Sequence, residues 1–554
     1  MEPGGEAVMK AVVKARYLAM LASLALLAGM MLLAPAAGAD RPDPSAVLDP
    51  AVAAAVADSK ANDTIPVIVV APGHLDDVQA ALPADVAENS LPLVGGVAAE
   101  LTSDEIWALA SLPFVDEILL DDPVNGVGFV DSLDITNLAI DLSSVAPPWA
   151  GGPTGDGVTV AIIDSGIDEH PDLLGDNGKM RLLAFKDFLR GRRRAYDDAG
   201  HGTFVAGLIA GNGASSLPLD QGGRAVRQYR GVAPEADIVS LKVLNKWGEG
   251  RESDVIRAIA WTIRNKERYD IRVLNVSLGG EIAGPVETDP LALAVEAAWK
   301  AGIVVVTAAG NEGEFGRGGI LSPGNDPYVI TVGATDTLQT PGTADDVVCS
   351  YSSLGPTLFD EFAKPDVVAP GNRNISLRVS WSWIDRVAPE NRIPVSDYVP
   401  GAPAGEPPAY FKLSGTSTSA PVVSGIVAML ISADPSLTPD DIKVRLMATA
   451  RDLPGTDPLQ EGAGAVDVAA ALLSTLHADG PALSADLGSG TTVLPADTYD
   501  RWAEYTWTKY RWTKYRWTKY RWTKYRWTKY RWTKYRWTKY RWTRYRWTTL
   551  IEGQ

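Results

Sequence analysis

The sequence predicts an α/β fold with a mainly parallel central sheet, preceded by a small α+β domain and followed by a low-complexity repeat tail. Between residues 145 and 473, short apolar runs rich in β-branched residues alternate with helical patterns, as in a parallel sheet covered on both faces. A β-α-β-β-α-β pattern precedes this region, and a pentapeptide repeat follows it. With 554 residues, 46% of them hydrophobic, the chain can bury a sizeable core.

The first 39 residues are expected to be a signal peptide. Three basic residues precede an apolar stretch at 18–33, and the small residues at 37–39 form a cleavage signal that would leave Asp40 as the new N-terminus. The alternative is an uncleaved membrane anchor, because the apolar run is near the short limit for a membrane span. The small-residue site favours cleavage, so we expect a secreted or extracellular protein, with association at the cell surface left open.

Charge is spread unevenly along the chain. The segment 506–554 holds sixteen Lys and Arg and one Glu, so it carries +15, and with a total of −17 the residues 1–505 carry −32. An acidic body repels phosphates, which argues against nucleic acid as a partner of the folded part. The single cysteine, Cys349, excludes an intrachain disulfide, but a large secreted protein can dispense with disulfides when its core is large.

Residues 40–130 are predicted to form the small α+β domain. Its expected strands lie at 65–70, at 91–101 (a pair broken at residues 95–96) and at 115–120. Its expected helices span 74–82 and a segment that ends at 112, with Ser103 as the N-cap of the second. The order suits an α+β domain of the split type, and an unrelated interaction module is the alternative.

Residues 131–475 are predicted to form the larger α/β unit. Its expected strands are 158–163, 238–243, 273–276, 303–307, 328–332 and 366–368, and its expected helices are 201–210, 252–265, 290–301, 418–433 and 438–448. Active sites in such folds gather at the carboxyl ends of the strands. Polar residues that follow these strands are therefore the first candidates for chemistry.

Three motifs in this unit carry candidate catalytic residues. Asp164 ends the apolar strand in VTVAIIDSGID, where a carboxylate is well placed to orient an imidazole. His201 begins an apolar helix in GHGTFVAGLIAG and is a candidate general base. Ser417 lies at a helix start in LSGTSTSAPVVSG, where the helix dipole favours developing negative charge. Taken singly, each residue has a plainer interpretation as a turn, surface or capping residue.

Together these motifs resemble the three signature blocks of the subtilase family, the subtilisin-like serine peptidases. They occur in the order Asp, His, Ser, which is the subtilisin order. Four further blocks agree: NVSLGG (275–280), AAGNEG (308–313), YSSLGP (351–356) and KPDVVAPG (364–371). The resemblance covers about residues 145–473 and implies a subtilisin-like three-layer fold and a serine endopeptidase whose triad is Asp164, His201 and Ser417.

The resemblance also assigns residues around the triad. Asn311 would stabilise the oxyanion. Two strands would flank an extended substrate and supply backbone hydrogen bonds, with Ser277, Leu278 and Gly279 on one side and Gly248, Glu249 and Gly250 on the other. The family implies protein or peptide substrates and no cofactor for the chemistry. It also implies that residues 40–130 are an inhibitory propeptide, cut by autoprocessing between about residues 121 and 144.

Some positions depart from the family's pattern. Phe204 stands where a second histidine is usual, Thr418-Ser419 where Met-Ala is usual, and Val422 where another histidine is common. None is a triad member, so we expect altered packing and retained activity. The long insertion at 372–410 is a further departure, and we expect it to shape the cleft.

No metal ligands are assigned. The loop 211–229 lacks a recognisable calcium loop, which leaves calcium open only as a structural ion without a placed site. Asp187, Asp197 and Asp198 offer carboxylates, and solvated surface acids are the alternative.

Residues 476–505 are predicted to be a linker, and residues 506–549 repeat the pentapeptide WTKYR almost without variation. A period of five matches neither a strand nor a helix, so the Trp side chains would appear on all faces. The composition favours a low-complexity, mostly disordered tail from an expanded repeat. The alternative is a cationic aromatic arm that binds an anionic cell surface.

The leading hypothesis is a secreted serine endopeptidase that is autoprocessed from a zymogen. The alternative from another class is a catalytically weak surface-binding scaffold that uses the cationic Trp-rich tail, against which the complete triad and Asn311 argue. A cell-anchored processing protease with few substrates is a third hypothesis that the sequence leaves open.

Overall fold

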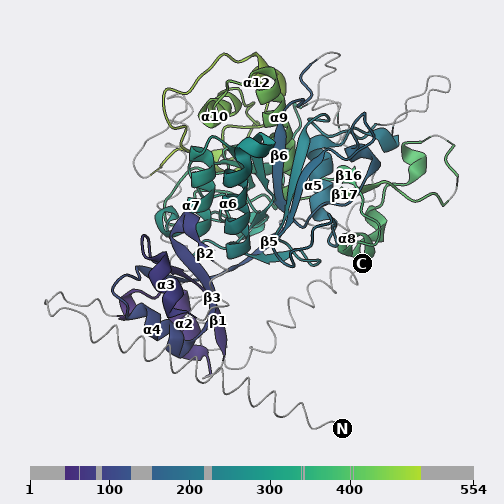
Figure 1. The fold of residues 1–554 in the computed structure, drawn as a ribbon. Coiled ribbons are helices and arrows are strands. Elements are labelled where there is room, and N and C mark those ends of the chain that lie inside the picture. Colours follow the sequence, from purple (N-terminus) through teal and green to yellow (C-terminus); the bar gives the residue numbers. More distant parts are fainter. Residues whose placement is uncertain are drawn as a thin grey trace, which may run out of the picture. The chain divides into compact units, whose positions relative to one another are not determined.

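The computed structural model describes residues 44–60, 63–82, 90–126, 152–216, 228–338, 340, 343–399, 401–403 and 405–487. The expected signal peptide, the repeat tail and the linker from residue 488 onward lie outside these residues and stay predictions. The described residues form two compact units, with the division between Asp122 and Pro123 (Figure 1).

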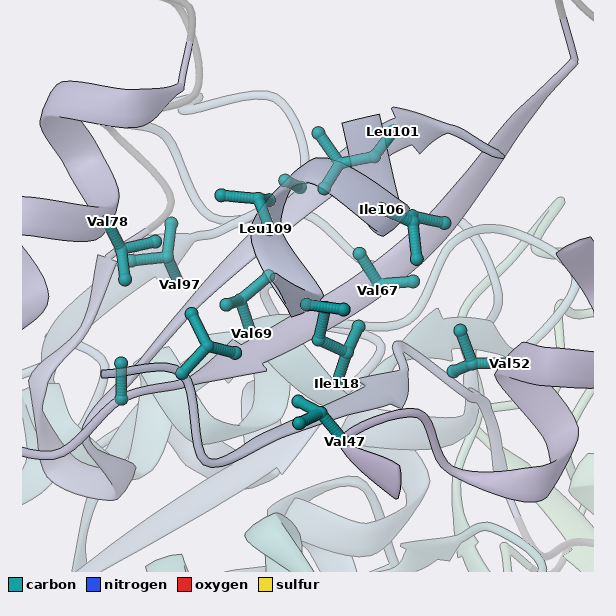
Figure 2. Packing of buried hydrophobic residues seen from close by; sticks show 14 of the residues in the cluster. Val47, Val52, Val67, Val69, Val78, Val97, Leu101, Ile106, Leu109 and Ile118 are labelled. Carbon is teal, nitrogen blue, oxygen red and sulfur yellow. The ribbon is translucent and has the colours of Figure 1, made fainter. Parts of the chain in front are cut away.

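The N-terminal unit is a four-stranded antiparallel sheet with helices. Its strands are β1 (Thr64–Val70), β2 (Ser90–Leu91), β3 (Gly96–Thr102) and β4 (Glu117–Leu120), in the spatial order β2-β3-β1-β4, and its helices are α2 (Pro50–Asp58), α3 (Leu75–Ala81) and α4 (Ser103–Ala110). From β1 onward, the order of strands and helices along the chain is the one that the sequence predicts. A core of Val, Leu and Ile side chains from the sheet and helices holds the unit together, as Figure 2 shows.

The expected cap of α4 was one residue too late. Thr102, not Ser103, is the N-cap, and it forms a capping box with Glu105. The Ser103 hydroxyl instead meets the hydroxyl of Ser59.

The second unit contains the predicted α/β sheet. Among the described residues this sheet has eight strands, in the order β14-β13-β12-β10-β6-β8-β7, with β15 also paired to β13. All pairs are parallel except β13 with β14. The strands are β6 (Thr159–Asp164), β7 (Leu182–Asp187), β8 (Asp237–Lys242), β10 (Ile271–Val276), β12 (Val304–Ala308), β13 (Ile330–Asp336), β14 (Val347–Val348) and β15 (Val367–Pro370).

Helices cover both faces of this sheet, which makes three layers. On one face lie α5 (His201–Ala210) and α9 (Thr416–Ala433), and on the other lie α6 (Glu252–Tyr269) and α7 (Pro290–Lys300) (Figure 1). By length and composition α9 could cross a membrane, but 89% of it is buried inside the protein, so its apolar residues form core. The fold prediction of a mainly parallel α/β sheet is thus confirmed.

Smaller elements surround this sheet. They are the strands β5 (Pro123–Gly126), β9 (Glu249–Arg251), β11 (Leu278–Gly279), β16 (Asn374–Leu377) and β17 (Tyr410–Leu413), and the helices α8 (Trp383–Val387), α10 (Pro439–Ala448), α11 (Pro458–Glu461) and α12 (Val468–Leu473). The strands β11, β5 and β9 form one small sheet, and β16 and β17 pair antiparallel at the two ends of the insertion 372–410.

The segment 476–486, which the sequence assigned to the start of a linker, packs against the second unit. Ala482 and Ala485 are buried, and Phe362 forms a β-bridge with Asp486. The Ser484 hydroxyl donates to Asp366 at 2.6 Å. The folded unit therefore continues at least eleven residues beyond the predicted end at 475, because these side chains cover buried charges that are described below.

Candidate active site

The three candidate catalytic side chains meet at the carboxyl edge of the sheet. Asp164 ends β6, His201 begins α5, and Ser417 is the second residue of α9. Nδ1 of His201 lies 2.8 Å and 2.9 Å from the two carboxylate oxygens of Asp164, and its Nε2 lies 3.1 Å from the Ser417 hydroxyl. All three residues are buried. A histidine held between a carboxylate and a hydroxyl is the arrangement that turns serine into a nucleophile.

Glycine allows the Asp and His segments to approach so closely. A Cβ on Gly202 would lie 2.2 Å from the carbonyl oxygen of Gly166. The Ser165 hydroxyl joins the two segments, because it accepts from the N–H of Gly202 at 2.8 Å and donates to Asp197 at 2.9 Å. A side chain at position 202 would push His201 away from the carboxylate at the end of β6.

Electrostatics favour a charged imidazole at this site. Burial by itself lowers the pKa of His201, but the adjacent Asp164 carboxylate, with a further contribution from Asp197, holds the pKa above its ordinary value. The site is thus arranged to stabilise an imidazolium next to Ser417.

Asn311 lies beside the serine, on the loop that follows β12. Its side-chain oxygen accepts from the backbone N–H of Thr416 at 3.0 Å and from the Thr416 hydroxyl at 3.1 Å. These bonds fix the amide plane next to the start of α9, where Ser417 lies. The same hydroxyl accepts from the N–H of Gly310 at 3.1 Å, so the two loops hold each other in place.

The two predicted substrate strands also meet here, and a segment of the chain lies between them. Strand β5 is antiparallel to both β9 and β11, with Asn125 opposite Glu249 on one side and Gly279 on the other. The N–H of Gly126 donates to the carbonyl of Gly248 at 2.8 Å. Strand β5 therefore lies as the middle strand between β9 and β11, which contain four of the six residues predicted to bind substrate: Glu249, Gly250, Leu278 and Gly279.

The end of β5 points to the triad. A Cβ on Gly126 would lie 3.9 Å from Nδ1 of His201 and 3.2 Å from Leu244. Upstream, Val124 is fully buried and lies next to Gly250 and Gly280. Sequence reasoning missed both β5 and the contribution of Leu244, because a four-residue strand that pairs only with distant segments has no local signal.

The positions that depart from the family's pattern are packed and hydrogen-bonded. Phe204 and Val422 are fully buried, and the carbonyl of Phe204 accepts from Ser376 at 2.7 Å. The Thr418 hydroxyl donates to the carbonyl of Gly371 at 3.1 Å.

The acids that were considered as metal ligands face protein donors. Asp187 accepts from three backbone N–H groups and from Tyr196, Asp197 accepts from Ser165, Gly200 and Thr203, and Asp198 pairs with Lys242 at 2.8 Å. Within residues 44–126 and 152–487, apart from the gaps given above, no group of three or more His, Cys, Asp or Glu could hold a metal ion.

Comparison with known proteins agrees with this geometry. The model of the subtilase family matches residues 155–465, more than half of the chain. The chain belongs to the subtilase family. It is 42% identical to the serine protease AprX of Bacillus subtilis over 319 residues, which cover 57% of this chain and 66% of AprX. It is 32% identical to subtilisin DY of Bacillus licheniformis over 324 residues, 58% of this chain and 93% of that protein.

A solved structure shows the subtilase fold independently. Fervidolysin from Fervidobacterium pennivorans, a keratinolytic enzyme related to subtilisin, superposes with a TM-score of 0.55 over 76% of this chain and 63% of its own, at 22% identity. The prediction of a subtilisin-like serine endopeptidase is therefore confirmed at the level of the family, and the roles of single residues rest on the geometry above.

Proposed function

We propose that this subtilase hydrolyses peptide bonds by acyl transfer, with Ser417 as nucleophile, His201 as general base and Asp164 as the residue that orients the imidazole. Ser417 attacks the peptide carbonyl while Nε2 of His201 takes its proton, and the imidazolium then gives that proton to the leaving amine. Water then attacks the acyl-enzyme while His201 takes its proton, and the imidazolium returns a proton to Ser417 as the acid product leaves. The observation that carries the proposal is the continuous set of contacts from Asp164 through His201 to Ser417.

The oxyanion of the tetrahedral intermediate would be held by the side-chain amide of Asn311 and by the backbone N–H of Ser417. Thr416 supports this role, because its two hydrogen bonds to Oδ1 orient the amide. In subtilisin, loss of the corresponding donor costs about 10²–10³ in kcat.

We further propose that protein substrates bind as β5 does, as a middle strand between β9 and β11. The backbone pairing supports broad sequence tolerance, since main-chain groups are common to all substrates. The buried position of Val124 supports a preference for an apolar side chain at the corresponding substrate position.

Strand β5 also supports autoprocessing. The end of this strand lies beside the triad, because a Cβ on Gly126 would be 3.9 Å from Nδ1 of His201. We propose that the chain is made as a secreted zymogen, that residues 40–127 are its propeptide, and that the first cut falls between Val127 and Gly128. The binding-scaffold alternative finds no support among the described residues.

The test compares the full chain with its Ser417→Ala variant by intact mass and by digestion of unfolded casein. The wild-type chain should release a fragment that ends at Val127 and should digest casein, whereas the variant should do neither. If the two proteins showed the same intact mass and the same casein digestion, the triad assignment would be wrong. A wild-type cut elsewhere in 121–144 would leave the triad standing and remove only the proposed bond.

A further inference from the structure

Strand β5 shows where side chains point when an extended chain lies between β9 and β11. Along β5, Pro123 and Asn125 are exposed, and Val124 between them is buried. Successive side chains of a strand point to opposite faces, so one face of this middle strand meets solvent and the other meets the core. A substrate bound in the same way would hold every second side chain on the exposed face.

Strand β9 places two charged residues along this exposed face. Its alternate residues Glu249 and Arg251 are exposed, and Gly250 lies between them. In the antiparallel pairing, Asn125 lies opposite Glu249, and Pro123 lies opposite Arg251. Directly opposite side chains of an antiparallel pair have Cβ atoms about 4.5–5.5 Å apart. The two charges therefore lie beside two alternate side chains of any chain that occupies the middle strand.

Local structure fixes the backbone of both charged residues. The N–H of Glu249 donates to the side-chain oxygen of Asn245 at 3.3 Å, and the Asn245 amide donates to the Glu249 carboxylate at 3.3 Å. Arg251 is the N-cap of α6 and has an extended backbone (φ −126°, ψ 150°), so β9 keeps its direction up to the first turn of the helix. The positions of the two charges along the strand are thus set before a substrate binds.

The strand on the other side of β5 offers no charge. Strand β11 consists of Leu278 and Gly279, both of which are buried, and Gly279 lies opposite Asn125. Of the two strands that flank β5, β9 alone can therefore distinguish substrates by the charge of their exposed side chains.

We propose that Glu249 and Arg251 are specificity-determining residues that select two alternate substrate side chains by charge. A basic side chain is favoured at the substrate position opposite Glu249, and an acidic side chain is favoured two residues earlier, opposite Arg251. Opposite charges that face each other across an antiparallel pair attract, and like charges repel. The proposal rests on the function proposed above, in which substrates bind as β5 does.

The experiment uses two internally quenched peptides with the sequence of residues 119–131, in which only the two positions are changed. The matched peptide has Pro123→Glu and Asn125→Lys, and the swapped peptide has Pro123→Lys and Asn125→Glu. Because the two peptides have the same composition and net charge, the basic segment 506–554 attracts both about equally.

Wild-type enzyme should cleave the matched peptide with a kcat/KM about tenfold higher than that of the swapped peptide, since each exposed pair is worth about two- to fivefold and the peptides differ at two pairs. The ratio should approach one in about 1 M salt, where the Debye length is about 3 Å. The double exchange Glu249→Arg with Arg251→Glu should reverse the preference, which a general loss of structure would not do. Arg251→Gln and Glu249→Gln each remove one pair and should lower the ratio about threefold, so they test the proposal even if the double exchange does not fold.

The matched control exchanges the same charges at exposed positions of α6, as Arg264→Glu with Glu267→Arg, and should keep the wild-type ratio because Arg264 lies about 20 Å from Arg251 along the helix. A ratio near one in wild type at low salt, or a preference that the double exchange on β9 does not reverse, would overturn the charge selection. If wild type still digests casein and Ser417→Ala does not, such a result removes only this selection. If Ser417→Ala cleaves the peptides as wild type does, the proposed function fails as well.

Discussion

Two buried clusters of charged residues in the second unit use the same chemistry toward different ends. In the triad, the Asp164 carboxylate meets one imidazole, whose far nitrogen is aimed at a hydroxyl. In the other cluster, the Asp366 carboxylate lies between Lys364 at 2.7 Å and Lys443 at 3.3 Å, and all three side chains are fully buried.

The clusters differ in their hydrogen bonding, because the lysine ammonium of the second cluster has acceptors on every side. Lys443 donates to the carbonyls of Pro327, Tyr328 and Val329 and binds the Ser484 hydroxyl, so its ammonium is enclosed by oxygens. Burial, with the charge of Lys364, lowers the pKa of Lys443 to about 7 despite the attraction of Asp366. A strongly shifted pKa alone therefore does not mark a catalytic group. What distinguishes the triad is the adjoining strand β5, whose Gly126 lies beside His201.

Asp164→Asn should break the triad and give the largest effect. An amide holds the imidazole in the wrong tautomer, so kcat should fall by about 10⁴ while the fold is retained. Steady-state hydrolysis of a peptide substrate measures the rate, and thermal unfolding checks the fold. A loss of less than about tenfold would contradict the role of Asp164.

Asp366→Asn should break the second cluster instead. Removal of the carboxylate takes from the buried Lys364 and Lys443 the acidic group that they share, which should cost about 3–5 kcal/mol in the free energy of unfolding. Urea denaturation measures this cost, with Ser417→Ala in all three proteins compared (the reference, Asp366→Asn and the control below) to prevent self-digestion. Glu267→Gln, at an ion pair whose carboxylate is 92% exposed, is the control and should leave the urea midpoint unchanged. Equal midpoints for all three proteins would show that the cluster does not support the fold.

A smaller effect concerns pH. Because the pKa of His201 is raised, the acid limb of kcat/KM should be centred above 6.5, since the base must be neutral to accept the serine proton. The stabilisation that the protonated imidazole provides is present below about pH 6.5 and is lost as the pH rises through the raised pKa, so stability and activity change in opposite directions. NMR titration of the four histidines would assign the group, and a midpoint for His201 at or below 6.5 would contradict the prediction.

Long, strongly patterned elements could be predicted well. Helix α5 has the predicted bounds, and α9 begins two residues earlier than the predicted 418. Both are rich in apolar residues after their first turn, and both begin at motifs whose order along the chain indicates a catalytic set. The triad followed from those motifs, and the structure adds the distances.

Elements that depend on distant partners could not be predicted. Strand β7 is an edge strand whose apolar run at 182–185 is only four residues long, and Asp187 is its one fully buried residue. Strands β16 and β17 have four residues each, and the insertion between them is shaped by Asp385 and its two arginines, which sequence spacing does not reveal. The packing of residues 476–486 on the second unit could not be predicted either, because their small and polar side chains are typical of a linker.

The position of Ser484 limits how far the chain can be shortened from its C-terminal side by autolysis before the fold loses stability. Among the described residues, Ser484 is the last along the chain that bonds to Lys443. A cut before Ser484 would take away a hydroxyl that binds both Lys443 and Asp366 and would let water reach them. We therefore expect autolysis from the C-terminal side to stop near Asp486, which would then be the C-terminus of the autolysed peptidase.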